Sequence, residues 1–312
     1  MDFKLVCLGN CAAGPVAGRW ASAQYFKVGR TGFLIDCAEG TQIALQEAGI
    51  GWSSIDYILI SHLHGDHCYG LPGLLTSWAL HQRQSQLTII GPAGLEAWIT
   101  HTLELSYATL TFEVTWQVSH PSEAPQRLAD TAHWTLDSLP LKHRIPCHGF
   151  LLREQARPRN MLAAAIKEYD IPFSEMPAIK AGADFVTASG ERIPNEQLTT
   201  AASPPRAFAY CSDTAYHEAL IPLVKGVDLL YHEATFLHEH LEQAIYTGHT
   251  TSRQAAELAH AAQVGQLVIG HCSRRYTDLT PLLEEARSIF PATVVAQTGR
   301  VIRVDFGFAQ PT

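Results

Sequence analysis

The chain has 312 residues, of which 46% are hydrophobic and 17% are charged, and its formal net charge is −8. A chain of this size can bury a substantial core, and it lacks the low-complexity tracts and the roughly 20–50-residue repeats that indicate disordered or solenoid proteins. The negative charge argues against indiscriminate nucleic-acid binding but leaves room for a local basic surface.

Apolar runs alternate with amphipathic stretches through the first half of the chain. Runs of β-branched and aromatic residues bounded by turn residues predict strands at 3–8, 24–28, 32–36, 55–61, 87–91, 111–119 and 131–141. The second and third of these strands join around Gly29 and Arg30 as a hairpin. Periodic apolar residues predict helices at 40–48, 71–82 and 92–105, the last opened by a proline near its first turn.

The last third of the chain repeats the same alternation. Strands are expected at 207–211, 228–232, 267–270 and 300–306, and helices at 215–224, 252–263 and 281–290. Strands that alternate with helices are typical of an α/β fold built in layers, with helices covering the sheets.

Residues 153–205 differ from the rest of the chain. They are rich in proline and polar residues, and only 161–169 has the pattern of a helix. Long segments with little core are usually functional or mobile. The sequence therefore predicts a single domain, 1–312, into which an arm of about 153–205 is inserted, projecting from the body rather than forming a second core. Around its start the chain is basic, with Lys142, Arg144, Arg153, Arg157 and Arg159.

Two further features bear on the compartment. No apolar run reaches the roughly 18–20 residues of a membrane span, and the first residues lack the pattern of a signal peptide. The seven cysteines include no C-x-x-C pair, and a reducing compartment explains them more simply than a disulfide framework does. We therefore expect a soluble, cytoplasmic protein that does not contact membranes.

Three histidines and an aspartate crowd into the six residues HLHGDH, directly after the strand that ends at Ser61. Imidazole nitrogen and carboxylate oxygen are the ligands that Zn²⁺ favours when no thiolate is used. On a tight loop the four side chains cannot all reach one ion at about 2 Å. His62 and His64 are therefore expected to form one half-site, and Asp66 and His67 another. The alternative is a solvated polar loop.

A two-metal site needs further ligands, and three later strands end in suitable residues. The segments LDSLPLKH, AFAYCSD and QLVIGH deliver His143, Asp213 and His271. Asp213 is the natural bridging ligand, because one carboxylate has two oxygens and can span two ions. His143 would complete the first half-site and His271 the second. Spacing alone does not separate His143 from His148, and a histidine after a strand can also be a hydrogen-bonded structural residue.

These blocks resemble a known family. HLHGDH with a later His, Asp and His is similar to the pattern of the metallo-β-lactamase superfamily, an αββα sandwich with metals at one edge of its two sheets. The continuations SHLHGDHCYGLPGLL, PLKHRIPCHGF, YCSDT, GVDLLYHEATF, GHTTSRQAAELA and LVIGHCSRRY resemble ribonuclease Z, the tRNA 3′-processing endonuclease, over nearly the whole chain. The resemblance implies a four-layer αββα sandwich, two Zn²⁺ per chain, His143 rather than His148 as the ligand, and a homodimer whose arm holds precursor tRNA.

The implied reaction is attack by hydroxide on a phosphodiester, which leaves a tRNA 3′-hydroxyl and a trailer with a 5′-phosphate. Two Zn²⁺ ions about 3.5–4 Å apart can hold that hydroxide, and Asp66 is expected to bind the second metal and to orient the nucleophile. His249, just before the helix 252–263, is the candidate proton donor to the leaving oxygen, and Glu233 of YHEATF would orient it. In ribonuclease Z the matching residues have this pair of roles. Alternatively, His249 caps the helix and Glu233 is a surface charge.

Four nearby residues have less specific patterns. We expect His232 to be structural. Arg274 and Arg275 either contact phosphate or form an ordinary exposed pair, and Asp36 either supports a ligand histidine or forms a turn.

Two other functions compete with this prediction. A small-molecule phosphodiesterase or ester hydrolase with the same metals would not need the arm. A non-catalytic RNA-binding protein would not need Asp66.

Overall fold

The computed structural model describes residues 2–120 and 122–305. The chain divides into two compact units. The first unit combines Met1–Arg153 with Arg206–Thr312, and the second unit is Glu154–Pro205. Across the described residues, no helix is both long enough and apolar enough to cross a bilayer.

The first unit contains two sheets. The first sheet has the order β18-β1-β2-β3-β4-β5-β6. Its strands are β1 (Phe3–Gly9), β2 (Ala23–Val28), β3 (Thr31–Ile35), β4 (Tyr57–Leu59), β5 (Leu87–Gly91), β6 (Val114–Val118) and β18 (Val301–Arg303). β2 and β3 form the predicted hairpin, with Val28 opposite Thr31, and Gly29 takes the positive φ of 57° that the turn needs.

The second sheet has the order β17-β16-β15-β14-β9-β8-β7. Its strands are β7 (Arg127–Asp130), β8 (Trp134–Pro140), β9 (His148–Glu154), β14 (Ala207–Cys211), β15 (Leu229–Glu233), β16 (Gln266–Gly270) and β17 (Thr293–Val295). β14 to β17 run parallel, so their carboxyl ends lie at one edge of the sheet. In open α/β sheets that edge is where ligands bind.

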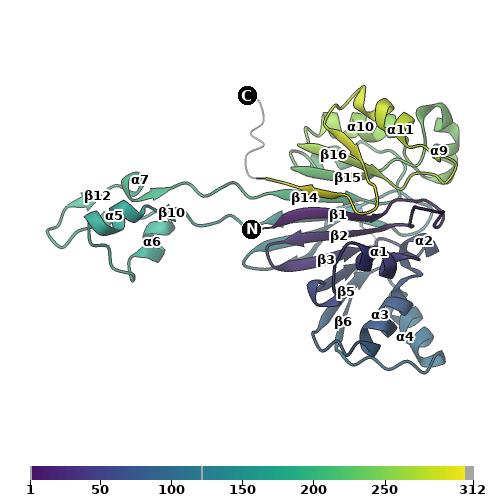
Figure 1. Cartoon of the computed structure of the whole chain (residues 1–312). Coiled ribbons are helices and arrows are strands. Elements are labelled where there is room, and N and C mark those ends of the chain that lie inside the picture. Colours follow the sequence, from purple (N-terminus) through teal and green to yellow (C-terminus); the bar gives the residue numbers. More distant parts are fainter. Residues whose placement is uncertain (1, 121, 306–312) are drawn as a thin grey trace. The chain divides into compact units, whose positions relative to one another are not determined.

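Helices cover the outer face of each sheet (Figure 1). Beside the first sheet lie α1 (Thr41–Glu47), α2 (Gly65–Cys68), α3 (Leu71–Leu80) and α4 (Leu95–Leu105). Beside the second sheet lie α8 (Leu220–Leu223), α9 (Leu241–Thr247), α10 (Ser252–Ala261) and α11 (Thr280–Arg287). Two single turns of 3₁₀-helix, η1 (Trp52–Ser54) and η2 (His238–His240), complete the described elements of this unit.

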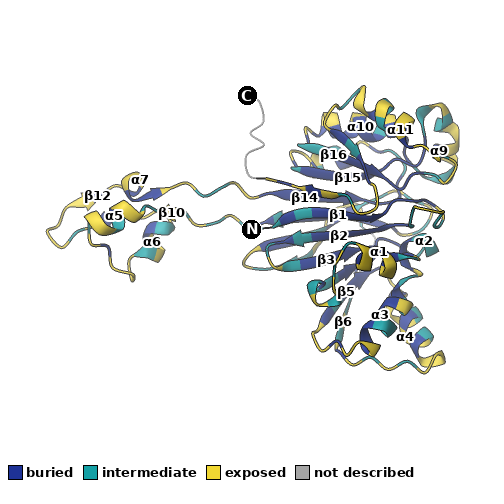
Figure 2. Cartoon of the chain, viewed as in Figure 1, coloured by how far each residue is buried: buried dark blue, intermediate teal, exposed yellow. Residues whose placement is uncertain are grey.

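Side chains alternate along the strands between separate apolar cores. In β3, Leu34 packs with α1, α3 and α4, whereas Phe33 and Ile35 belong to a core between the two sheets. In β15, Leu230 packs with α8, α10 and α11, and Leu229 faces the first sheet. The layers are therefore helices, sheet, sheet and helices, which confirms the predicted αββα sandwich. Figure 2 shows these strands as dark blue and the outer sides of α10 and α11 as yellow.

Several elements differ from the sequence-based predictions. Strands β9 and β17 and helix α9 were not predicted, and the helix expected at 215–224 is only α8. Six of the seven residues of β9 are buried, although its sequence, HGFLLRE, begins with histidine and glycine, which weaken a strand pattern. Phe306, the last residue of the strand expected at 300–306, lies outside the described residues.

The second unit has a small core of its own. Its elements are β10 (Asn160–Met161), α5 (Ala163–Glu168), α6 (Met176–Lys180), β11 (Phe185–Val186), β12 (Arg192–Ile193), α7 (Asn195–Leu198) and β13 (Thr199–Thr200). Its buried apolar residues are Ala165, Ile171, Ile179, Phe185, Ile193 and Leu198. The helix expected at 161–169 is present as α5, whereas α6 and α7 were not predicted, because elements of two to six residues are too short to show a periodic pattern.

Candidate metal centre

The HLHGDH motif follows β4 and continues into α2, which contains Asp66 and His67. His62 and His67 are fully buried, and His64 and Asp66 are partly exposed. His64 has an extended backbone, and α2 starts at the next residue. The change from extended to helical backbone sends successive side chains in different directions, so the motif supplies two groups of ligand atoms rather than one.

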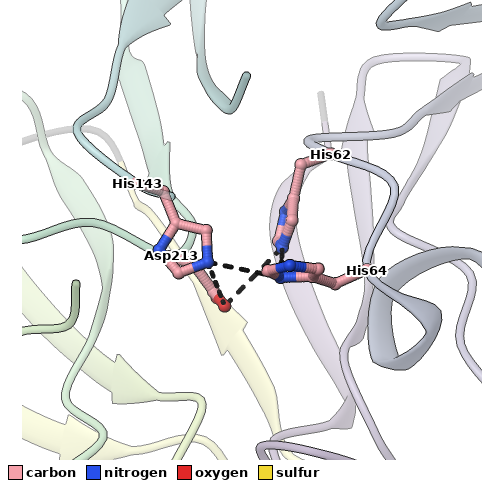
Figure 3. Close-up of side chains that lie close together, drawn as sticks. All are labelled: His62, His64, His143 and Asp213. Atoms are coloured by element: carbon pink, nitrogen blue, oxygen red, sulfur yellow. Dashed lines mark hydrogen bonds and ion pairs between the residues drawn. The ribbon is translucent and has the colours of Figure 1, made fainter. Parts of the chain in front are cut away.

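The first group consists of His62, His64, His143 and Asp213 (Figure 3). His62 Nε2 lies 3.0 Å from His64 Nδ1, and His143 Nε2 lies 3.3 Å from the same atom. Asp213 Oδ2 faces this group, 3.7 Å from His62 Nε2 and 3.8 Å from His143 Nε2. His143 comes from the chain after β8 and Asp213 from the chain after β14, as their positions after strands predicted.

The second group consists of Asp66, His67 and His271. The Nε2 atoms of His67 and His271 are 3.2 Å apart, and Asp66 Oδ2 lies 3.4 Å from His271 Nε2. Asp213 faces this group with its other oxygen, because Oδ1 lies 3.2 Å from His67 Nε2 and 3.3 Å from His271 Nε2. The carboxylate of Asp213 therefore lies between the two groups.

These atoms fit divalent cations. The nitrogens of His62 and His64 are 3.0 Å apart, and those of His67 and His271 are 3.2 Å apart. Each of these two pairs can share at most one proton. Asp213 Oδ1 is buried without a partner in hydrogen-bonding geometry. Burial holds the pKa of His62 well below its usual range, which keeps its imidazole in the neutral form that binds metal. Buried lone pairs of this kind are costly unless a cation pairs with them, and nitrogen with carboxylate oxygen is a donor set that suits Zn²⁺.

Hydrogen bonds on the far side of the rings fix their orientation. Asp36 is fully buried, and its Oδ2 lies 2.8 Å from His67 Nδ1 and accepts a hydrogen bond from the Tyr210 hydroxyl at 2.8 Å. His143 Nδ1 lies 2.9 Å from the Gly248 carbonyl oxygen. Such partners select the tautomer that presents the other nitrogen to a metal. Of the two roles considered for Asp36, the structure has the one beside a ligand histidine.

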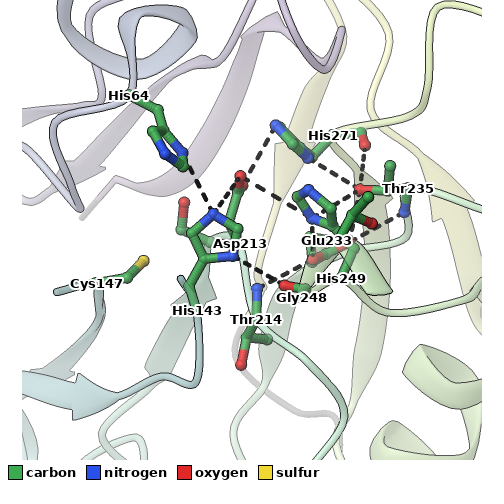
Figure 4. A network of polar contacts seen from close by, with 12 residues as sticks. His64, His143, Cys147, Asp213, Thr214, Glu233, Thr235, Gly248, His249 and His271 are labelled. Atoms are coloured by element: carbon green, nitrogen blue, oxygen red, sulfur yellow. Dashed lines mark hydrogen bonds and ion pairs between the residues drawn. The ribbon is translucent and has the colours of Figure 1, made fainter. Parts of the chain in front are cut away.

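A histidine–glutamate pair lies beside the two groups (Figure 4). His249 Nδ1 is 2.8 Å from Glu233 Oε1, and Glu233 is fully buried. Glu233 also accepts hydrogen bonds from the backbone N–H groups of Thr214 and Thr235, each at 3.0 Å. Burial disfavours the imidazolium, but the Glu233 carboxylate outweighs it and raises the pKa of His249 to about 9.

The alternatives considered for this pair do not hold. The cap of α10 is Thr251, whose hydroxyl accepts a hydrogen bond from the Gln254 N–H in a complete capping box. His249 is therefore not the cap, and Glu233 is not a surface charge.

A cavity of about 370 Å³ opens over the site. Two arginines, Arg144 and Arg274, line it together with His64, Asp66 and His249. The neighbouring arginine has a different environment, since the Arg275 guanidinium lies 5.0 Å above the Phe236 ring. The cavity thus combines ligand-type side chains with positive charge suited to a phosphate.

His148 and His232, which the sequence analysis also considered, lie outside both groups. His148 is buried at the start of β9, where a hydrogen bond joins it to the backbone of Ser119. His232 is buried with Nδ1 2.7 Å from the Glu233 carbonyl oxygen.

Three residues that contact the site were missed in the sequence analysis. Thr235 Oγ1 lies 3.0 Å from His271 Nδ1 and donates to Glu233 Oε2 at 2.7 Å, so it connects the second group to the histidine–glutamate pair. The Ala13 N–H donates to Asp66 Oδ2 at 2.6 Å, and Cys147 Sγ lies 3.6 Å from His62 Nδ1. The place of Thr235 two residues after Glu233 was a usable signal, whereas the other two contacts depend on the fold.

Comparisons with known proteins identify relatives of this chain and proteins that share its fold. Residues 3–156 match the family described as anti-Pycsar protein Apyc1. The chain is 43% identical over 303 residues to a ribonuclease Z of Parabacteroides distasonis, covering 97% of this chain and 99% of that protein. Its structure is similar to the crystal structure of human tRNase Z, short form, with a TM-score of 0.72 and 25% sequence identity. The match covers 97% of this chain and 100% of the human chain. The metallo-β-lactamase fold protein YhfI from Bacillus subtilis, 19% identical, shares the fold with a TM-score of 0.66 and coverage of 97% and 100%.

Proposed function

The chain belongs to the ribonuclease Z family of metal-dependent endoribonucleases, and we propose that it removes the 3′ trailer from precursor tRNA. The observation that carries the proposal is the position of Asp213, with one oxygen toward each group of histidines. Two half-sites that share one carboxylate suit a two-metal phosphodiesterase. The cut would leave a 3′-hydroxyl on the tRNA and a 5′-phosphate on the trailer.

The proposed cofactors are two Zn²⁺ ions per chain. The first would be held by His62, His64, His143 and Asp213, and the second by Asp66, His67, His271 and Asp213. When bound, the metals lower the pKa of water toward neutrality and neutralise charge on a phosphate. The buried, closely opposed ring nitrogens support these assignments.

Asp66 has a second proposed role, which is to orient the attacking water. Its Oδ2 accepts the Ala13 N–H and lies 3.4 Å from His271 Nε2. A carboxylate anchored in this way presents its lone pairs in a fixed direction, and a water that donates to it is held for attack on the phosphorus.

His249 is the proposed donor of a proton to the leaving 3′-oxygen. Glu233 is bonded to Nδ1, which leaves Nε2 to meet the substrate in the cavity that His249 lines. Glu233 holds the ring through its own buried hydrogen bonds. A ribose oxygen is a poor leaving group unless it is protonated, so a donor at this place would accelerate the cut.

Two parts of the protein would hold the RNA. Arg144 and Arg274 line the cavity and would contact the scissile phosphate or its neighbour. We assign the second unit, Glu154–Pro205, the role of the arm that holds the tRNA body, within a protein whose remaining residues form the catalytic domain. Arg157, Arg159 and Lys180 line one cavity of this unit and suit contact with phosphates.

The remaining proposals concern the compartment and the assembly. We expect a cytoplasmic location, and all seven cysteines are free and buried, as suits a reducing compartment. We also expect a homodimer, as for the family, which light scattering of the purified protein would test.

The decisive experiment is cleavage of a tRNA that carries a 3′ trailer, with zinc supplied and the cut mapped. The wild type should cut once, at the end of the mature tRNA, and Asp66→Ala should not cut while still binding the RNA. Failure of the wild type to cut, alongside hydrolysis of bis(4-nitrophenyl) phosphate, would mean that the substrate is a small phosphodiester. Cleavage by Asp66→Ala at the wild-type rate would contradict the assigned chemistry.

A further inference from the structure

One large aromatic side chain lies exposed beside the metal centre. Tyr69 follows α2 at the end of the motif turn, and 61% of it is exposed. No side chain in the described part of the chain hydrogen-bonds to its hydroxyl. Neither the core nor a polar network therefore accounts for its position.

The ring of Tyr69 is nevertheless held in place on two sides. A Cβ added at Gly65 would lie 2.4 Å from Tyr69 Cε2, so the ring rests directly against the Gly65 backbone. On another side the ring meets Trp98 of α4, with 5.8 Å between ring centroids and 47° between ring planes. Trp98 is itself partly buried against the core beneath the first sheet. The exposed ring is thus supported by rigid neighbours.

Its support places the ring next to the reaction site. Gly65 lines the cavity over the metal centre, between His64 and Asp66, which line it too. Arg144 and Arg274 line the same cavity. A phosphate bound there would bring the neighbouring nucleotide of a single strand toward the rim at Gly65, where the Tyr69 ring begins.

We propose that Tyr69, supported by Trp98, is a stacking platform for the unpaired base next to the scissile phosphate of an RNA substrate. The inference rests on the proposed function, since it needs RNA in the cavity. Stacking on an aromatic ring is tolerant of sequence, because every base has a π face, and proteins commonly hold unpaired RNA bases in this way. Such a platform would position the nucleotide without reading its identity.

Other exposed tyrosines lack this combination of features and provide a control. Tyr107 is 95% exposed and lies just beyond the end of α4. Among the described residues it makes no ring contact with another aromatic side chain, whereas Tyr69 meets Trp98. Tyr107→Ala therefore removes an exposed ring of the same size away from the proposed platform.

The test compares Tyr69→Ala, Tyr69→Phe and Tyr107→Ala with the wild type on two substrates. The first is a tRNA with a 3′ trailer, either intact or with one abasic nucleotide on either side of the cleaved bond. The second is bis(4-nitrophenyl) phosphate, which has no base to stack. Tyr69→Ala should raise KM for the intact tRNA about 5- to 150-fold, the range expected from losing one base–aromatic stack. Tyr69→Phe and Tyr107→Ala should match the wild type.

The abasic substrates identify the base. At one of the two positions, the abasic nucleotide should raise the KM of the wild type as much as Tyr69→Ala raises it on the intact tRNA. The same abasic nucleotide should not raise the KM of Tyr69→Ala any further. An unchanged KM in Tyr69→Ala, or an equal abasic penalty in both enzymes, would overturn the platform. If Tyr69→Ala lost activity on the aryl phosphodiester to the same extent, the platform would also be overturned, since Tyr69 would then support Gly65 and the metal centre. If the wild type hydrolyses the aryl ester but cuts no RNA, the proposed function fails, and the platform fails with it.

Discussion

The two units of this chain achieve order in different ways. The first unit buries charged and polar side chains such as Asp36, His62 and Glu233 at the carboxyl edge of its second sheet and the facing loop of its first. The second unit relies on six buried apolar residues, and a unit of its size is only marginally stable. The difference fits the proposed roles, with catalysis in the first unit, whose site is held by buried hydrogen bonds, and RNA binding in the less stable second unit.

The largest expected effect comes from removing the carboxylate between the two groups. In Asp213→Ala, the rings of His67 and His271 lose the oxygen they share, and the first group loses its only acidic member. We expect zinc content to fall below two equivalents and hydrolysis of both tRNA and aryl phosphodiester to fall more than about 100-fold, beyond the loss seen for outer partners of ligands. Metal analysis and initial rates check this.

A matched control is Asp137→Ala, which removes an aspartate that pairs with Arg127 away from the site. It should leave zinc content and both rates unchanged. Two full zinc equivalents and wild-type rates in Asp213→Ala would refute the bridging assignment. Hydrogen exchange in the second unit should be the same in both variants if the two units are independent.

The next effect separates protonation from the rest of the chemistry. His249→Ala should slow tRNA cleavage about 10²- to 10⁴-fold, because the leaving ribose oxygen loses its proton donor. Hydrolysis of bis(4-nitrophenyl) phosphate should stay near the wild-type rate, since nitrophenolate leaves without a proton. The rate of tRNA cleavage by Glu233→Gln should lie between the rates of His249→Ala and the wild type. Equal losses on both substrates would instead show that His249 supports the metal groups.

Much of the candidate site could be predicted because its ligand-type side chains belong to short patterns. HLHGDH is dense in such side chains, and Asp213 and His271 each follow an apolar strand, where parallel strands bring residues together. Choosing His143 over His148 needed the family resemblance, since both lie near strand ends. The structure distinguishes the two histidines. His143 Nε2 lies 3.3 Å from His64 Nδ1, whereas His148 forms a hydrogen bond with the backbone of Ser119.

The parts that could not be predicted depend on contacts between distant segments. The support of His67 by Asp36 joins residues 31 apart in sequence, and the contact of Ala13 with Asp66 joins residues 53 apart. Such contacts leave no local pattern. The core of the second unit escaped prediction for a related reason, because its elements are too short for periodicity to identify them.

A smaller and more selective effect should follow from removing the second unit. Strands β9 and β14 are antiparallel neighbours with Arg153 opposite Ala207, so a short Gly-Ser linker can replace residues 155–204. We expect zinc content and aryl phosphodiester hydrolysis to be unchanged. The kcat/KM for tRNA should fall about 100-fold, the scale on which a linked second contact raises affinity. Unchanged tRNA cleavage would show that the second unit does not hold the RNA, and loss of zinc would show that the units are not independent.

The smallest effect tests whether the second unit must be folded to hold RNA. Asn195 is buried there, and its Nδ2 donates to the carbonyl oxygens of Ile179 at 2.7 Å and Ala183 at 2.6 Å. Asn195→Ala removes the side-chain donor to the Ala183 carbonyl, which should cost about 1–3 kcal/mol, whereas the Ile179 carbonyl keeps the Gly182 N–H at 2.9 Å. That is a large share of what so small a core supplies, so hydrogen exchange in the second unit should rise and KM for tRNA should increase several-fold. Asn160→Ala, an exposed position in the same unit, should change neither. If Asn195→Ala raises exchange but leaves KM unaltered, the second unit does not hold the RNA through its folded form.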